Sequence, residues 1–255
     1  MALFTDGPIN STADLQNHDS AILDVATIEG IDLTAKMTLA QESIGDEILT
    51  FLLHNLARDR RSRTRRFIGL EDVVVTRPLG RWHAIKSLAM AYGDAYGHQL
   101  NERYQAKWQE FEGQAQLSSQ QYLNVGVGLV LDPVPKAAPP SISATVGNGN
   151  PVRYYVAVSW VNASDHEGAP SGLTMLDTSA GAIITLAMQN APRGTTGWYV
   201  YLGAAPTSLM RQNNTPVPAG STWQTTAPNL VQGDPQNTGQ RPEWFLFNDR
   251  VLLRG

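Results

Sequence analysis

Apolar residues recur at helical spacing in the first half of the chain. Three stretches show the pattern: residues 19–29, which stop at Gly30; residues 33–56, which follow Asp32; and residues 81–111. Apolar side chains three and four positions apart share one face of an α-helix. Glycine often follows the last turn of a helix, and aspartate often caps the first. The pattern therefore predicts three helices, with Asp32 as the N-cap of the second.

The third stretch carries an unusually aromatic stripe. Its members are Trp82, Ile85, Ala89, Tyr92, Tyr96, Leu100, Tyr104, Trp108 and Phe111. Because apolar stripes at this spacing normally face a core, we interpret the stripe as a surface that packs against other helices or a neighbouring subunit. The alternative is a platform on which a ligand stacks.

The pattern changes near residue 132, where short β-branched and aromatic runs begin. Residues 152–161 alternate between two faces, and residues 182–188 and 198–202 form further runs. Turn dipeptides separate them, at Asn148-Gly149, Glu167-Gly168 and Ala219-Gly220. Several short strands at this spacing are typical of a β-sandwich.

These patterns predict an α+β chain: a helical bundle (residues 1–131), then a β-sandwich (residues 141–233), then a short apolar C-terminal tail (residues 234–255). Residues 132–140 between the two domains contain four prolines. Because proline lacks a backbone donor and fixes its own φ, this segment predicts a semi-rigid spacer.

The tail ends in two apolar clusters on either side of Asn248-Asp249, which suits a tight turn. The clustered residues are Trp244, Phe245, Leu246, Phe247, Val251, Leu252 and Leu253. A hairpin this short is unstable by itself, so we expect the tail to dock. Two sites remain open: its own helical domain, or a partner protein or neighbouring subunit.

The amino-acid composition argues against several classes of function. Charged residues form only 16% of the chain, and 19 Lys and Arg against 23 Asp and Glu give a net charge of −4. The low charge suggests a surface covered by other subunits, and the acidic balance argues against a general nucleic-acid binder. No apolar run is long enough to cross a membrane. Residues 1–6 lack the basic start of a secretion signal. We therefore expect a soluble protein made in the cytoplasm, without a membrane partner.

No sequence motif indicates a catalytic site. The absence of cysteine excludes a thiolate metal site and a cysteine nucleophile. His18, His54, His83, His98 and His166 show no metal-ligand spacing, and we interpret His54 and His83 as packing residues. Residues 165–167 read as a polar hairpin loop. We predict no enzyme, no cofactor and no metal.

One basic cluster is prominent. Six arginines fall within nine residues: Arg58, Arg60, Arg61, Arg63, Arg65 and Arg66. They follow the second predicted helix, where cations favour the negative end of its dipole. The cluster is either a solvated helix end, a surface that binds an acidic protein partner, or a basic collar that faces nucleic-acid phosphates.

The helical half resembles the head-to-tail adaptor (head-completion, or connector) proteins of tailed bacteriophages. The residues that carry the resemblance are Leu15–Leu33 with Lys36, Pro78–His83, Tyr92–Tyr96, Leu100–Tyr104, Lys107 with Trp108, and Gly126–Pro135. The resemblance implies a homo-oligomeric ring of twelve copies at the virion neck. Such a ring binds the portal protein and a tail or neck protein, and genomic DNA passes through its lumen without sequence-specific contacts.

The second half resembles an immunoglobulin-like or fibronectin-III-like module, through Tyr154–Trp160, Glu167–Ser171 and Gly197–Tyr201. It lacks the cysteine pair of antibody domains, so only the sandwich is implied. Two other functions stay open. One is a virion decoration or tail-tip protein whose sandwich binds carbohydrate. That function would use Trp160, Trp198, Tyr199, Tyr201 or Trp223. The other is a helical DNA-binding regulator that uses the arginine cluster, against which the acidic balance argues.

Overall fold

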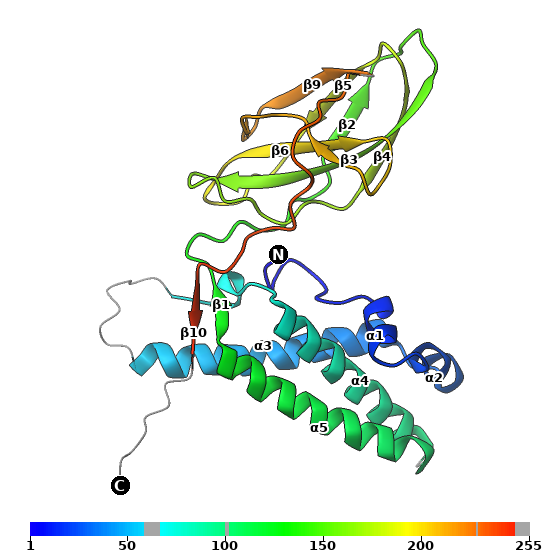
Figure 1. Ribbon diagram of the computed structural model, residues 1–255, viewed down its shortest axis with the longest axis vertical. Coiled ribbons are helices and arrows are strands. Elements are labelled where there is room, and N and C mark those ends of the chain that lie inside the picture. Colours follow the sequence, from blue (N-terminus) through cyan, green and yellow to red (C-terminus); the bar gives the residue numbers. More distant parts are fainter. Residues whose placement is uncertain (59–66, 100–101, 228, 248–255) are drawn as a thin grey trace. The chain divides into compact units, whose positions relative to one another are not determined.

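The chain folds into two units, each built from segments that are distant in the sequence. The computed structural model describes residues 1–58, 67–99, 102–227 and 229–247. The β unit contains residues 1–6 and 131–241, and the helical unit contains residues 7–130 and 242–255. The chain therefore passes from one unit to the other three times (Figure 1).

The first helices begin and end where local chemistry dictates. Helix α1 (Thr12–His18) starts with a capping box, in which Ser11 and Asp14 each accept from the other's backbone N–H. Helix α2 (Ile22–Glu29) ends at Gly30, whose φ of 67° is left-handed. Helix α3 (Leu33–Arg58) starts after Asp32, whose carboxylate accepts from two backbone N–H groups of the first turn. The predicted N-cap and glycine stop are confirmed.

The third predicted helix is in fact two. Helices α4 (Arg77–Gln99) and α5 (Glu102–Val125) pack side by side (Figure 1). Rings stack between them, Tyr92 on Phe111 and Tyr96 on Trp108. Because the paired residue numbers rise on one helix as they fall on the other, the helices are antiparallel. The prediction of a single helix over residues 81–111 was wrong. The apolar residues keep a 3.6-residue period on both sides of the point where the chain reverses direction, so the period does not reveal the reversal.

A large core cluster of the helical unit contains residues from all five helices, α1 to α5. Its buried members are Leu15, Ile22, Val25, Ala26, Ile31, Leu33, Met37, Ala84, Ile85, Leu88, Ala89, Ala91, Tyr92, Ala95, Tyr104, Phe111 and Ala115. The described aromatic residues of the predicted stripe are packing residues, as expected; Leu100 lies outside the described residues.

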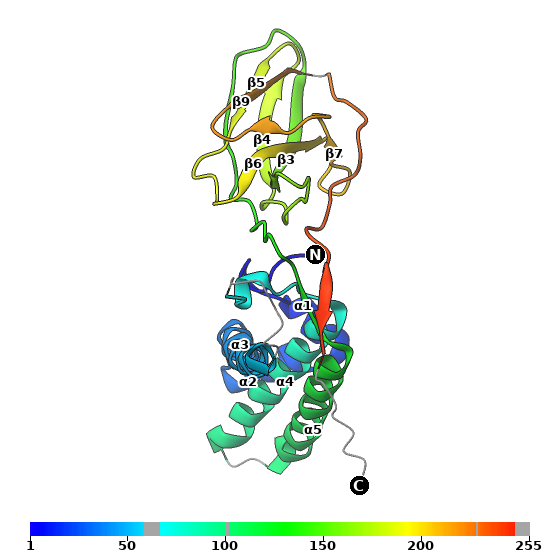
Figure 2. The ribbon, with the colours of Figure 1, turned by 90° about the vertical axis from the view of Figure 1, so that its left-hand side faces the viewer.

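A small sheet completes this unit. Strand β1 (Val127–Leu129) follows α5 and pairs antiparallel with β10 (Trp244–Leu246), near the end of the described chain. On its other side β1 bridges to Val73, just after the short helix η1 (Leu70–Asp72). Figure 2 shows β10 lying beside β1.

The β unit consists of two antiparallel sheets. Its strands are β2 (Ser141–Ala144), β3 (Pro151–Asn162), β4 (Thr174–Ser179), β5 (Ile183–Ala187), β6 (Thr195–Gly203), β7 (Met210–Arg211), β8 (Val217–Pro218) and β9 (Thr222–Thr226). One sheet has the order β2-β5-β9; the other has the order β4-β3-β6-β7, with β8 also on β6. The predicted strands over residues 152–161, 182–188 and 198–202 correspond to β3, β5 and β6.

The two sheets share one core, and strands β3 and β6 of the larger sheet are buried on both faces. Tyr154, Val156 and Val158 face the core with Ile184 and Leu186 of the other sheet. A second cluster lies on the opposite face of β3 and β6, formed by Ala157, Val161, Tyr199, Tyr201 and Leu209. The alternation of side chains along β3 therefore does not separate a buried face from a solvent-exposed face.

Residues 132–140 are not a free spacer. Val134 and Ala137 are buried in the β-unit core. The Val134 N–H donates to Gln240 Oε1 (2.6 Å), and the Lys136 N–H donates to Asp6 Oδ1 (2.7 Å). The proline-rich composition correctly predicts extended chain, but that chain packs as part of the β unit.

The segment after β9 also belongs to the β unit. We call residues 229–241 the return segment. Val231 exchanges two hydrogen bonds with the Gln212 side chain, and Asp234 accepts from the Arg211 backbone N–H. A separate tail over residues 234–255 is therefore wrong: its start packs on the sheet, and only its later part joins the helical unit.

The observed fold class is α+β, as predicted, with antiparallel sheets. Within the described residues, no helix is both long and apolar enough to span a membrane.

Candidate functional site

The arginine cluster begins at the end of α3. Arg58 is the last residue of this helix, and Arg60, Arg61, Arg63, Arg65 and Arg66 lie outside the described residues. Only the position of Arg58, at the end of α3 as described, agrees with the predicted location of the cluster. Its contacts are not part of the described structure, and its role stays a prediction.

Half of the apolar tail docks on the helical unit. Trp244, Phe245 and Leu246 pair with β1. Gly126, with a φ of 106°, is a close neighbour of Phe247: a Cβ there would lie 2.8 Å from its ring. The first of the two docking sites left open is therefore occupied by residues 244–247, while Val251, Leu252 and Leu253 lie outside the described residues.

The aromatic residues considered for carbohydrate binding are mostly buried. Trp160, Trp198, Tyr199 and Tyr201 are at most 4% exposed, and only Trp223 is partly exposed. A sugar stacks on an open ring face, which the four buried rings lack. Core packing explains these four residues.

The loop at residues 165–167 does more than turn the chain. The Glu167 carboxylate accepts from the hydroxyls of Ser159 and Tyr201, and Asp165 accepts from the Tyr199 hydroxyl (3.0 Å). Burial and these carboxylates raise the pKa of both tyrosines. The loop was correctly predicted, but no local pattern indicates its pairing with the tyrosines of β6, which are more than 30 residues away.

His83 is a packing residue, as predicted. It is fully buried; its Nε2 lies 3.0 Å from the Met37 carbonyl oxygen and its Nδ1 lies 3.1 Å from the Asn10 amide nitrogen. Burial lowers the pKa of His83, and the bond to Met37 partly opposes this shift. His54, by contrast, is exposed, so the packing role predicted for it was wrong.

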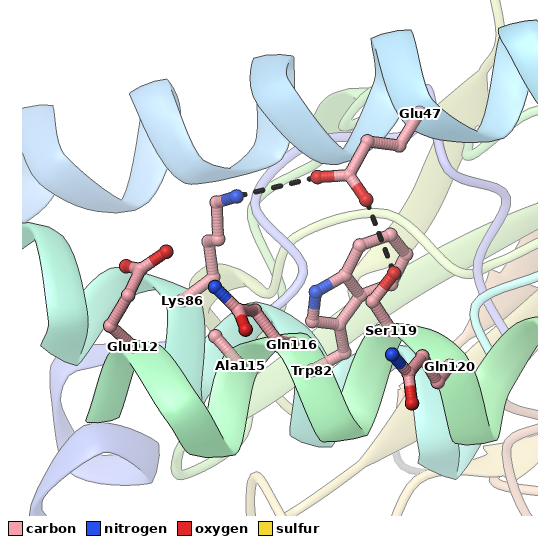
Figure 3. A pocket seen from close by; sticks show the side chains of 8 residues that line it. All are labelled: Glu47, Trp82, Lys86, Glu112, Ala115, Gln116, Ser119 and Gln120. Carbon is pink, nitrogen blue, oxygen red and sulfur yellow. Dashed lines mark hydrogen bonds and ion pairs between the residues drawn. The ribbon is translucent and has the colours of Figure 1, made fainter. Parts of the chain in front are cut away.

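The helical unit also contains a polar pocket of about 240 Å³ that no motif indicated. Helix α3 contributes Glu47; helix α4 contributes Trp82 and Lys86; and α5 contributes the remaining lining residues, Glu112, Ala115, Gln116, Ser119 and Gln120 (Figure 3). Because α3 and α5 both pack on α4, the pocket opens in the groove between them. The residues come from three helices, and no local spacing could have joined them.

One carboxylate bridges the helices at this pocket. Glu47 accepts from Lys86 Nζ (3.3 Å) through one oxygen and from Ser119 Oγ (3.1 Å) through the other. Beneath it, the fully buried ring of Trp82 packs against Tyr122, with centroids 5.7 Å apart. The pocket thus has a rigid aromatic floor and a fixed ion pair on one wall.

The pocket offers hydrogen bonds rather than a metal site or a nucleophile. Two carboxylates and one ammonium give its lining a formal charge of −1. Among the described residues, no group of three or more His, Cys, Asp or Glu side chains could hold a metal ion. The arrangement is suited to recognising a small polar group.

Comparisons with protein-family models, with curated proteins and with solved structures found no match for this chain. Its function is therefore inferred from its own residues.

Proposed function

We propose that this protein is a structural, non-catalytic component of a tailed-bacteriophage virion. It forms a homo-oligomeric connector ring at the neck, between the portal protein and the tail, after assembly in the host cytoplasm. Genomic DNA passes through the lumen of the ring. The low content of charged residues supports an assembled state, because a surface that contacts other subunits carries fewer charges.

One observation carries the proposal: the stretches that resemble phage adaptors supply the packing of the helical unit. Leu15, Ile22 and Val25 come from the first stretch, and Tyr92 and Tyr104 from later ones; all five are buried in one core. The resemblance thus falls on residues that hold the helices together, which favours a shared fold over a chance likeness of composition.

We infer that the β unit is an immunoglobulin-like or fibronectin-III-like module attached to the adaptor. The chain crosses between its two sheets four times, as expected for such sandwiches. Trp160 and Trp198 are cross-strand neighbours at its centre, on β3 and β6. They occupy the core without the cysteine pair of antibody domains.

The arginine cluster gives the ring a means of binding an acidic surface. A single copy on a chain of net charge −4 would bind DNA poorly. Repeated around a ring, the same cluster becomes a continuous basic belt, and guanidinium groups pair well with carboxylates and phosphates.

The direct test mixes the purified protein with its cognate portal. We expect a protein that is monomeric or loosely associated alone and that forms a ring on the portal, seen by particle mass and negative-stain imaging. Absence of any complex at micromolar concentration would refute the proposal.

A second test addresses the cluster. Replacing Arg60, Arg61, Arg63 and Arg65 by glutamine should preserve the circular dichroism spectrum, because the proposed role of these arginines is to bind a partner and not to stabilise the fold. It should weaken portal binding or retention of packaged DNA. The matched control is Arg153→Gln with Arg193→Gln, two exposed arginines of the β unit. Fully infectious virions with the fourfold change would mean that the cluster is only a solvated helix end.

A further inference from the structure

The loop between β2 and β3 (residues 145–150) contains the Asn148-Gly149 pair, which plays no part in the proposed function. Asn148 is exposed, and among the described residues no hydrogen bond holds its side-chain amide. Asparagine followed by glycine is especially prone to spontaneous deamidation, because glycine has no side chain to hinder attack of its backbone nitrogen on the asparagine amide carbon. The sequence and the exposure therefore indicate that Asn148 is chemically labile.

The fold, however, occupies the attacking nitrogen. The Gly149 backbone N–H donates to the Ala180 carbonyl oxygen (2.9 Å), and the Ala180 N–H donates to the Asn150 carbonyl oxygen (3.0 Å). The nitrogen must lose its proton before it attacks, and a backbone N–H held in a hydrogen bond releases its proton only when that bond opens. In the closed loop the reaction at Asn148 is therefore blocked.

The rest of the loop is also held against the turn between β4 and β5. Gly147 exchanges two hydrogen bonds with the Ser179 hydroxyl, one through its N–H and one through its carbonyl oxygen (both 3.0 Å). A Cβ on Gly147 would collide with the Ala180 carbonyl oxygen, and a Cβ on Gly149 would lie 2.5 Å from the Ala180 side chain. Two glycines thus permit the close approach that brings the Gly149 N–H to its acceptor.

We propose that Asn148 is a modification site gated by this loop: its side-chain amide is converted to aspartate or isoaspartate when the loop opens. The Gly149 nitrogen bonds to the amide carbon of Asn148, the bond from that carbon to the amide nitrogen breaks, and ammonia leaves with the proton given up by Gly149. Water then opens the resulting cyclic imide at either carbonyl. One opening gives aspartate and the other gives isoaspartate, and nothing is oxidised or reduced.

Formation of isoaspartate makes the opening of the loop irreversible. Either product adds a negative charge beside the turn, and isoaspartate also lengthens the backbone by one carbon atom. The longer backbone does not fit where Gly147 and Gly149 approach Ala180 closely, so the hydrogen bond from Gly149 to Ala180 does not form again. This inference does not depend on the proposed ring, and it can hold or fail independently of it.

The experiment uses the full-length protein in H₂¹⁸O, either folded in buffer or unfolded in urea at the same pH. Peptide mapping by mass spectrometry measures the incorporation of ¹⁸O at Asn148. We expect conversion in the unfolded chain and conversion at least about fivefold slower in the folded protein, the factor for one net hydrogen bond. Equal rates in the two states, or no conversion in the unfolded chain, would overturn the proposal.

Asn150 is the internal control, because it lies in the same loop and is equally exposed. It is followed by Pro151, which has no backbone N–H and cannot form the cyclic imide. We expect no conversion at Asn150 in either state. Conversion at Asn150 as fast as at Asn148 would mean that water attacks the amides directly, and it would overturn the proposed reaction.

A matched pair of variants tests the gate. Ser179→Ala removes both hydrogen bonds to Gly147 and leaves the Asn148-Gly149 pair unchanged, so conversion in the folded protein should accelerate at least about fivefold. Ser208→Ala removes a hydroxyl that bonds a carbonyl elsewhere in the β unit, and it should leave the rate unchanged. Equal rates in the two variants would show that attachment of the loop does not control the reaction, and they would overturn the proposal.

Discussion

His83 shows how a single buried side chain sets a condition on stability. The Met37 carbonyl can only accept and the Asn10 amide nitrogen can only donate, so the ring is neutral, with its proton on Nε2. A second proton on Nδ1 would face the Asn10 donor. His83 therefore stabilises the helical unit only in its neutral form.

This arrangement predicts a pH dependence. Burial lowers the pKa of His83 in the folded protein, so the unfolded chain, with its ordinary pKa of 6.5, binds the proton more readily. The contribution of neutral His83 to the free energy of unfolding is fully present above about pH 6.5. It is lost as the pH falls from there toward the pKa of His83 in the folded protein. Urea unfolding at several pH values would measure the slope of the free energy of unfolding against pH. His83→Gln should reduce it, whereas His54→Gln, at an exposed position, should not. Identical slopes in both variants would contradict the prediction.

Two tyrosines of the helical unit differ in the state of their hydroxyls. Tyr92 donates to Asp19 Oδ2 (2.6 Å), whereas the buried Tyr122 hydroxyl has no partner among the described residues. Burial raises the pKa of both, and Asp19 adds to the shift at Tyr92. Only Tyr92 therefore gains a hydrogen bond from its oxygen.

Removing the tyrosine hydroxyl should therefore change the free energy of unfolding differently at the two positions. Tyr92→Phe is expected to cost about 1.5–3 kcal/mol, the range for a hydrogen bond to a charged group, while Tyr122→Phe should be neutral or stabilising. Denaturant unfolding of the two variants measures both values. Equal destabilisation would show that the hydroxyls do not account for the difference.

At the scale of elements, the helical hairpin was hidden within a single periodic stretch. A stripe with a 3.6-residue period continues through α4 and α5, because both helices turn their aromatic residues toward each other. Close packing of α4 against α5 also requires a residue without a side chain at Gly93. A Cβ on Gly93 would lie 3.1 Å from the Trp108 indole nitrogen. The periodicity correctly indicated helix and burial, but not the reversal that pairs the rings.

Strand β10 is the element whose role the sequence left undecided. It extends the sheet of the helical unit, and the Glu243 N–H donates to the Leu129 carbonyl oxygen (2.9 Å) beside it. Gly128 leaves room for Pro242, where a Cβ would lie 2.8 Å from the ring. Two glycines in and next to β1 thus allow the close approach of the returning chain.

Truncation after Arg241 should therefore destabilise the helical unit. We expect a loss of about 1.5–3 kcal/mol, the value for burying one large apolar side chain, here shared between the partly buried Trp244 and Leu246. Hydrogen exchange of the β1 backbone should accelerate, while β3 and β6 stay protected. The matched control removes only residues 248–255. Unchanged exchange in β1 after the longer truncation would show that β10 does not stabilise this unit in solution.

At the scale of the whole molecule, the two units are interleaved in sequence. The β unit needs residues 1–6, the proline-rich segment and the return segment, all outside the predicted limits of the sandwich. Leu3 and Phe4, which belong to the first of these segments, are buried. A domain cut at the composition boundaries therefore removes parts of its own core.

This organisation predicts a difference between two fragments. A fragment of residues 131–241 should be more stable than one of residues 141–233 by at least about 2 kcal/mol, because Val134 alone is a fully buried side chain. Urea unfolding of both compares them, and Val134→Ala in the longer fragment measures its share. Equal free energies of unfolding would mean that the flanking segments only rest on the sandwich.

The sequence by itself determined what depends on neighbours along the chain. Helix starts such as Asp32, stops such as Gly30, the strand periodicity of β3 and the extended proline-rich segment were all predictable, because a few adjacent residues fix the backbone there.

The tertiary structure alone decided how distant segments combine. The reversal between α4 and α5, the docking of β10 on β1 and the pocket around Trp82 join residues from separate elements. Their positions depend on the free energy of packing summed over the whole chain. A local pattern records that a side chain is buried, but not which distant surface buries it.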